Sequence, residues 1–169
     1  MAFSNQVQGL DEVIRNLNIE IAKIKGATKQ GLVKSLALVR YNTEHTPPLT
    51  PVDLGNLRAS WFVVTADSVP VGKGTEQFKG PKAAEMLSDH SSMVQECQQI
   101  AQSDAIKKII VIGGYSANYA VYVHELLGTA SGKEIMWSRV GSGPKWLEWA
   151  FTRSQQDILV RIAENARVK

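Results

Sequence analysis

The stretch PVDLGNLRASWFVVT, residues 51–65, contains a turn that leads directly into a strand. Asp53 offers a side chain that accepts hydrogen bonds from nearby backbone amides, and Gly55 is free to adopt a positive φ. Residues 57–65 are rich in β-branched and aromatic side chains, which predicts a strand. A second strand is predicted over residues 107–113, where four consecutive apolar residues are typical of a strand buried on both faces, against a helix on one side and a neighbouring subunit on the other.

Apolar residues recur at helical spacing on either side of these strands. Before them, we expect one amphipathic helix that ends near Gly26 and a second over about 27–44, which is stopped by Pro47-Pro48. After them, Pro144 is expected to open a closing helix that runs to about Ala166. Helices therefore flank the predicted strands at both ends of the chain.

The segment between the strands, residues 67–104, is longer than a hairpin connection needs. Residues 69–80 contain glycines, prolines and lysines and indicate a mobile excursion. Residues 81–101 predict one or two helices, interrupted near 89–92, in which the lone Cys97 is a half-buried structural thiol. We expect this segment to be an addition on the rim of the fold.

Two further segments follow the second predicted strand. Ser116 is expected to cap a short helix that holds Tyr119 and Tyr122, although a strand is the alternative. Residues 127–143 contain four glycines and predict a long surface loop with an exposed apolar point at Met136-Trp137.

Bulk composition places the chain among ordinary globular proteins. Its 169 residues suit one domain spanning 1–169, and a net charge of +3 is only a weak indication of anionic partners. One cysteine leaves no intramolecular disulfide and fits a reducing cytosol. Neither a signal peptide nor an apolar run of about 20 residues is recognisable, so we expect a soluble protein with no membrane association.

Catalytic motifs are weak throughout. The three histidines lack zinc-site spacing, because His124-Glu125 is followed by glycine at position 128 where HExxH needs histidine. A metal or hydrolytic site at His124 needs Asp53, Glu44 or His45 brought close by the fold. Gly141-Ser142-Gly143 lacks the spacing of a nucleophile elbow, and residues 72–75 imitate only the end of a phosphate loop. We expect no catalytic centre, metal or cofactor.

Basic and aromatic residues suggest candidate contact surfaces. Three lysines of the 67–104 segment, together with residues 107–108, form a candidate DNA-contacting patch beside Phe78: Lys73, Lys79 and Lys82. Among the aromatic residues we expect Trp61 and one of Trp146 and Trp149 in the core. Aromatic and sulfur-bearing side chains are enriched at protein interfaces, so three residues are candidate interface positions: Trp137, Met136 and Tyr115.

Two motifs, taken in order, carry a family resemblance. The first is GNLRAS at 55–60, preceded by Pro48, and the second is YAVYVHE at 119–125, followed by Gly128-Thr129. Then comes GPKWL at 143–147, which opens the last helix. In this order they resemble the head–tail joining or tail-completion proteins in the neck of tailed bacteriophages. The resemblance covers about 8–66 and 107–166, and we interpret 67–104 as an insertion.

The resemblance implies an α+β fold in which N-terminal helices and a C-terminal helix pack on a small, mainly antiparallel β-sheet. It implies a structural virion protein rather than an enzyme, made in the host cytoplasm and located in the neck. Its partners would be itself, in a homo-oligomeric ring with a hexamer favoured, and the neighbouring connector and tail proteins, with weak contact to packaged DNA.

The residues that match the family motifs are expected to have structural roles: Pro48, Gly55, Leu57, Arg58, Ser60, Tyr119, Ala120, Tyr122, Val123, Glu125, Gly128 and Thr129. The sequence departs from the family pattern at His124, and at Leu126-Leu127, which shift the Gly-Thr pair by one residue. Arg58 and Glu125 are the expected partners in a charge-assisted hydrogen bond, either within the fold or across subunits. Two alternatives stay open: a small metal-dependent hydrolase or nuclease centred on His124 and Glu125, and a non-specific DNA-binding module.

Overall fold

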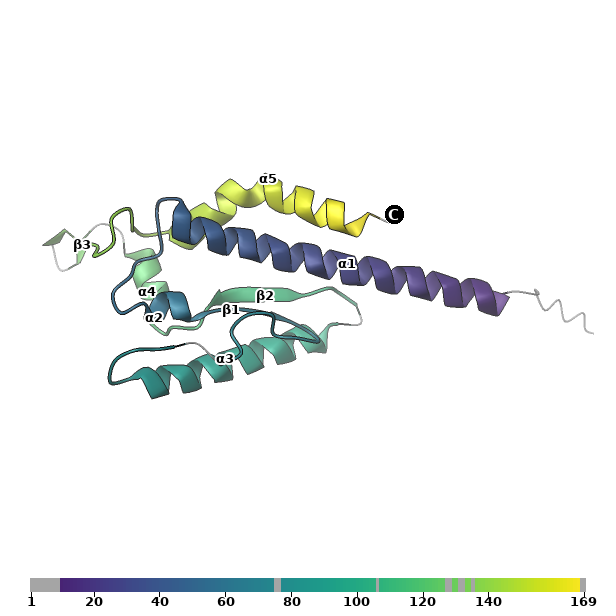
Figure 1. The fold of residues 1–169 in the computed structure, drawn as a ribbon, viewed down its shortest axis with the longest axis horizontal. Coiled ribbons are helices and arrows are strands. Elements are labelled where there is room, and N and C mark those ends of the chain that lie inside the picture. The colour runs from purple at the N-terminus through teal and green to yellow at the C-terminus, as the bar shows by residue number, and fades with distance from the viewer. Residues whose placement is uncertain are drawn as a thin grey trace, which may run out of the picture.

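Four layers are stacked in the order α5, α1, the β1–β2 sheet and α3 (Figure 1). The structure is a computed structural model that describes residues 10–74, 77–105, 107–126, 129–130, 133–134 and 136–167. The elements are α1 (Leu10–His45), α2 (Asn56–Ala59), β1 (Trp61–Thr65), α3 (Ala83–Ser103), β2 (Val111–Tyr115), α4 (Ala120–Glu125), β3 (Thr129–Ala130), β4 (Lys133–Glu134) and α5 (Trp146–Ala166). The α+β class, with helices packed on a small antiparallel sheet, is confirmed.

The N-terminal region forms one helix of 36 residues instead of the two that were predicted. Gly26 lies inside α1 and does not end it. A glycine in a helix interior costs only about 1 kcal/mol relative to alanine, which strong helix formers on both sides offset. The C-terminal half of α1 packs on the sheet and on α5, with Val39 and Thr43 fully buried.

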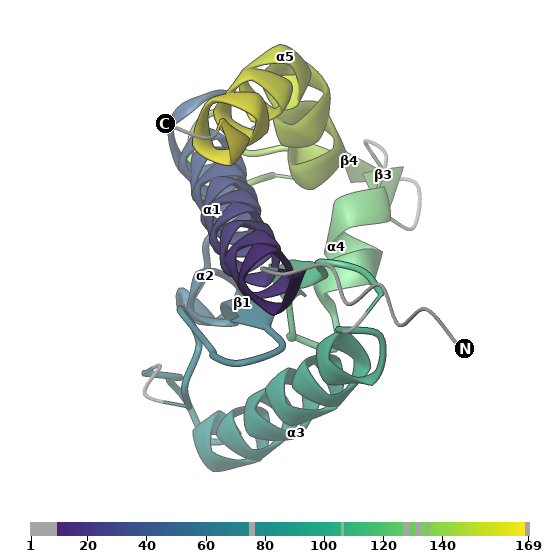
Figure 2. The same ribbon diagram turned by 90° about the vertical axis from the view of Figure 1, so that its right-hand side faces the viewer.

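The central sheet consists of two antiparallel strands, connected through α3, in which Trp61 pairs with Tyr115 and Thr65 with Val111. Strand β1 begins four residues later than predicted, because residues 56–59 form α2. All five residues of β1 are buried, as expected for a strand covered by α1 on one face and α3 on the other (Figure 2). Strand β2 begins at Val111, four residues later than predicted, and its residues are half-buried. The predicted start of this strand is therefore wrong, while its burial against a neighbouring subunit on one face stays a prediction.

Helix α3 runs without interruption along the face of the sheet opposite α1 (Figure 1). Val94 and Cys97 of α3 pack against Phe62 and Val64 of β1 in one core cluster. The predicted break near residues 89–92 and the predicted rim position are both wrong, because this helix supplies one side of the core. Whether 67–104 is an insertion relative to other proteins stays a prediction.

The C-terminal helix closes the opposite side of α1. Trp146, Ala150 and Ser154 of α5 are buried, and the side-chain amide of Asn42 donates a hydrogen bond of 2.7 Å to Ser154 Oγ. Trp61 and Trp146 are in the core while Trp149 is exposed, as predicted. The helix begins at Trp146, two residues after Pro144. Within the described part of the chain, none of the helices is long and apolar enough to span a bilayer.

Candidate functional site

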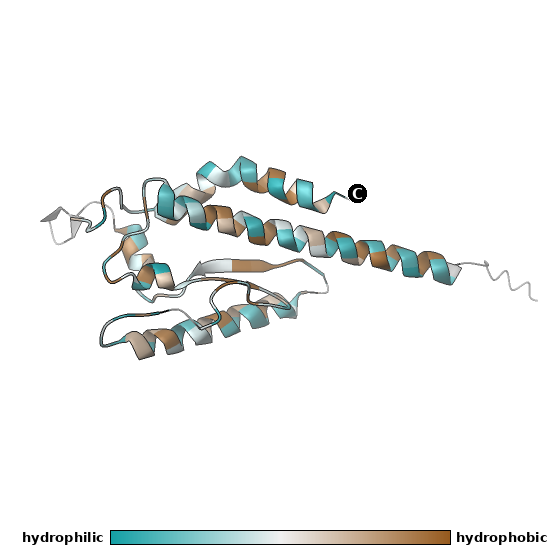
Figure 3. Cartoon of the chain, in the orientation of Figure 1, coloured by the Kyte–Doolittle hydropathy of each residue, from teal (hydrophilic) through white to brown (hydrophobic). Residues whose placement is uncertain are grey.

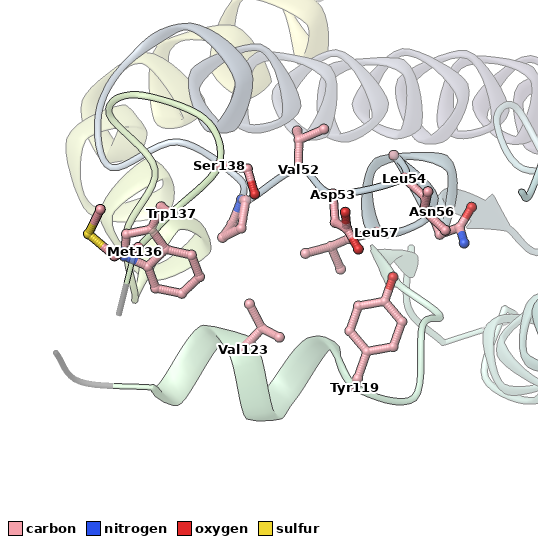
Figure 4. A pocket seen from close by; sticks show the side chains of 12 residues that line it. Val52, Asp53, Leu54, Asn56, Leu57, Tyr119, Val123, Met136, Trp137 and Ser138 are labelled. Atoms are coloured by element: carbon pink, nitrogen blue, oxygen red, sulfur yellow. The ribbon is translucent and has the colours of Figure 1, made fainter. Parts of the chain in front are cut away.

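An open groove of about 440 Å³ lies where the two sequence motifs meet (Figure 4). Residues 51–57 form one wall, and Tyr119 and Val123 of the α4 region form another. Residues 136–138, which include Trp137, close one end of the groove. Segments about 70 residues apart in sequence thus create one surface.

The first wall is shaped by backbone geometry. Gly55 has a φ of 89°, as its place in the predicted turn indicated, and a side chain there would be strained by its conformation rather than by a neighbour. The Asn56 side chain then fixes the wall to the next loop. Its amide donates to the Lys79 carbonyl at 2.9 Å, and its carbonyl accepts from the Lys79 amide at 2.8 Å.

Beneath the groove, the two motifs share one core cluster. Leu57 of the first motif, Ala120 of the second and Trp146 at the start of α5 are buried against each other. Val123 packs on the edge of the same cluster. The motif residues therefore position the groove by joining α2, α4 and α5 into a single unit.

The groove is apolar with one acidic position. Of the described residues that line it, Asp53 alone carries a charged side chain. Burial, and secondarily the nearby Asp53 charge, raise the pKa of the Tyr119 phenol. Tyr119 is therefore a neutral hydroxyl at physiological pH, and the surface suits an apolar segment with a hydrogen-bonding or cationic group at one edge.

A buried ion cluster lies at the end of α1. Glu44 is 7% exposed, and its carboxylate contacts Arg40 at 2.9 Å, Arg58 at 2.6 Å and Arg139 at 3.0 Å. Arg139 also donates to the Glu44 carbonyl. The cluster thus joins α1, the first motif and the segment that follows the groove loop.

Within the chain Arg58 therefore pairs with Glu44 and not with Glu125, so the predicted contact within the fold is wrong, and the contact across subunits stays a prediction. Glu125 contacts Lys145 at 2.5 Å and His124 at 2.7 Å. The hydrogen bond from Lys145, followed by that from His124, holds the pKa of the Glu125 carboxyl below its ordinary value. The same contact raises the pKa of the Lys145 ammonium. Glu125 ties α4 to the start of α5.

The candidate interface residues have different positions. Met136 is 90% exposed, and Trp137 is half-buried against the groove. Tyr115 lies inside the fold, where its hydroxyl accepts a hydrogen bond of 2.7 Å from Arg40 and contacts Thr43 at 3.0 Å. These contacts give half-buried Tyr115 a role within the fold, and its place at an interface stays a prediction.

The other motif residues divide between core and surface. Ser60 is buried and donates to the Leu57 carbonyl at 2.8 Å, while Pro48 is half-buried beside Gly143. Tyr122 is 64% exposed. Gly128 lies outside the described residues, and Thr129 is the first residue of β3. Ser116 does not cap α4, because its hydroxyl contacts His90 Nδ1 at 2.7 Å.

The geometry around His124 does not favour a metal-dependent site. Its Nδ1 contacts Glu125, its Nε2 lies 3.4 Å from the Glu148 amide, and its ring packs edge-on against Trp146. Glu44, one of the three residues that could complete such a site, is held in the arginine cluster. Across the ranges that the structure describes, no three His, Cys, Asp or Glu side chains are grouped so that they could hold a metal ion.

The candidate DNA-contacting lysines do not form one patch with residues 107–108. Lys79 and Lys82 are exposed near the start of α3, whereas Lys73 lies beside the middle of that helix, near Ser91 and Gln95. Residues 107–108 follow the other end of α3, and its 21 helical residues place them roughly 30 Å from Lys79 and Lys82. A continuous basic surface is therefore not assembled from these residues.

Glu44, Arg40 and Arg139 were not recognised as a cluster from the sequence. Arg40 and Glu44 have the i,i+4 spacing of a helical ion pair, which was the available signal. Nothing in the sequence around Arg139 indicates its partner, 95 residues earlier.

Comparison of the chain with protein-family models, curated proteins and solved structures finds no match.

Proposed function

We propose that this protein is a structural component of the neck of a tailed bacteriophage, where copies of it form a ring that completes the head–tail connection. The observation that carries the proposal is the groove: two motifs that resemble those of neck proteins meet there and share the core cluster beneath it. Although the two motifs are far apart in the sequence, their residues build one surface together.

The surroundings of the groove favour protein contact over catalysis. Met136 at its end is 90% exposed and Val140, shortly after, is 95% exposed. Exposed apolar side chains gathered at one site mark interaction surfaces more often than scattered ones do. Trp137 beside them has the large area and the polar handle of an interface anchor. In this proposal the groove receives an apolar segment of a neighbouring subunit.

A complementation experiment tests the proposal. A stop codon early in the gene should yield DNA-filled heads and separate tails that do not join, and the wild-type gene supplied in trans should restore infectious particles. A normal yield of infectious particles from the interrupted gene would contradict the proposal.

Two matched variants then test the groove. Met136→Glu should fold normally but fail to complement, because a carboxylate buried against an apolar partner is strongly unfavourable. Met93→Glu, at an exposed position on α3, is the control and should complement. Full complementation by Met136→Glu would remove the groove from the proposed interface.

A further inference from the structure

The N-terminal half of α1 extends past the end of α5 and carries an uncovered apolar stripe. Residues 10–30 of α1, roughly 30 Å of helix, precede Gly31, beside which α5 ends (Figure 1). Apolar and polar residues alternate along this part of the helix (Figure 3). The exposed apolar residues of the stripe are Val13 at 62%, Ile14 at 48%, Leu17 at 58%, Ile21 at 41% and Ile24 at 37%.

This stripe continues the face of α1 that packs on the rest of the fold. An interval of 18 residues is about five helical turns, so residues 18 apart share a face. Each stripe residue lies 18 positions before a buried or half-buried residue of the packed half, and the pairs are Val13 and Gly31, Ile14 and Leu32, Leu17 and Ser35, Ile21 and Val39, and Ile24 and Asn42.

Helix α5 covers part of this face and then ends. Asn42 is bonded to Ser154, and Lys34 donates to the Asn165 side chain at 2.9 Å, so α5 runs antiparallel to α1. A Cβ at Gly31 would lie 3.1 Å from Ile162 Cα, which places the last turn of α5 there. The stripe before Gly31 presents the same apolar face with no helix of the described chain upon it.

We propose that a second copy of this chain covers the stripe, with the two α1 helices antiparallel about a two-fold axis near residue 19. A second α1 in this direction begins where α5 ends and continues its path along the stripe. A parallel copy would instead run into α5, which occupies the same face from Gly31 onward. The position of α5 therefore selects the antiparallel arrangement.

The side chains suit this pairing. Ile14 meets Ile24 of the partner subunit, and Leu17 meets Ile21 of the partner subunit, in the alternating three- and four-residue spacing of a coiled-coil seam. Asp11, near the start of the stripe, approaches Lys25 of the partner subunit. Because of the two-fold symmetry, this ion pair occurs twice in the dimer. Glu20 approaches its own symmetry copy, but its ion pair with Lys23 at 2.6 Å offsets the repulsion.

The contact is isologous and closes on two copies, unlike the head-to-tail contacts of a ring. It uses the far end of α1 from the groove, so it does not rest on the proposed function. Loss of neck function and loss of this dimer are separate outcomes.

Sedimentation of the full-length protein over a dilution series tests the dimer. The wild type should dissociate from dimer to monomer on dilution, and Leu17→Glu should raise the dissociation constant by about a hundredfold or more, because symmetry buries two carboxylates in the seam. Ile19→Glu is the matched control: Ile19 is 47% exposed on the opposite face of the same helix and should leave the dimer intact. A wild type that is monomeric at every concentration, or equal effects of the two variants, would overturn the proposal.

Cross-linking tests the direction of the helices. In a Cys97→Ala background, a mixture of Ile14→Cys and Ile24→Cys proteins should form a mixed disulfide, while neither protein alone should cross-link. Helical content by circular dichroism, unchanged in each variant, shows that folding is retained. Self-cross-linking of each single variant, the signature of a parallel pair, would overturn the antiparallel arrangement.

Discussion

Replacing Glu44 by glutamine should destabilise this protein more than any substitution at an exposed ion pair. Glu44 is 7% exposed and contacts three guanidinium groups, those of Arg40, Arg58 and Arg139. Glutamine keeps the size and much of the hydrogen-bonding capacity of the side chain but removes its charge. Three arginines would then lie together without the carboxylate that compensates them.

The expected magnitude follows from the exposure of each arginine. Removing one member of a fully buried ion pair costs about 3–5 kcal/mol, while exposed pairs contribute about 0–1 kcal/mol. Arg58 is 45% exposed and so contributes near the lower value, whereas Arg40 and Arg139 are 22% and 28% exposed. We expect a loss of about 2–3 kcal/mol in the free energy of unfolding, intermediate between these limits.

Urea unfolding followed by fluorescence and circular dichroism measures this loss. With a slope of about 2 kcal/mol per molar urea, the midpoint should fall by roughly 1–1.5 M. Glu85→Gln is the control, since Glu85 is exposed and lies 4.0 Å from Lys82. A double-mutant cycle with Arg139→Gln should give a coupling of about 1 kcal/mol or more. A Glu44→Gln midpoint within 0.2 M or so of the control would refute the assigned role of the cluster.

Three further predictions concern single groups. An NMR titration of Glu125 should give a pKa below that of an ordinary glutamate. The stability that this carboxylate contributes is therefore present above the ordinary pKa of glutamate and is lost as the pH falls through the lowered pKa of Glu125. Lys145→Met should raise the pKa of Glu125, and an unshifted pKa in the wild type would count against the contact. Gly72→Ala should lower the free energy of unfolding by about 1–3 kcal/mol, since Gly72 has a φ of 82° and a Cβ there would lie 2.6 Å from Phe62 Cβ. Gly114→Ala is the control, because a Cβ at Gly114 meets no atom within 4 Å, and equal thermal midpoints of the two variants would contradict the strain at Gly72. Burial raises the pKa of the Cys97 thiol, with Glu96 adding to the effect, so a thiol reagent should label the folded protein far more slowly than the unfolded one, and equal rates would show that Cys97 is accessible.

Local signals in the sequence predicted several features of the fold. Gly55 was expected to have a positive φ, and Trp61 was expected in the core. Each depends on a residue's own conformational preference or on its hydrophobicity within a short window. The helical character of most of residues 81–101 was predicted for the same reason.

Features that depend on tertiary placement were predicted poorly. Arg58 has two plausible acidic partners in the sequence, and the choice of Glu44 over Glu125 is decided by where α1 ends. The length of α1 was missed because glycine at position 26 is a local signal that the rest of the helix outweighs. The place of α3 in the core follows from its packing on Phe62, which no periodicity within 67–104 indicates.

Quantitative mass spectrometry of purified phage particles would test the central proposal most directly. If this protein forms a ring in the neck, it should be present in mature virions at one ring per particle, in fixed ratio to the other neck proteins. Its complete absence from virions that carry all other structural proteins would contradict a structural role in the neck.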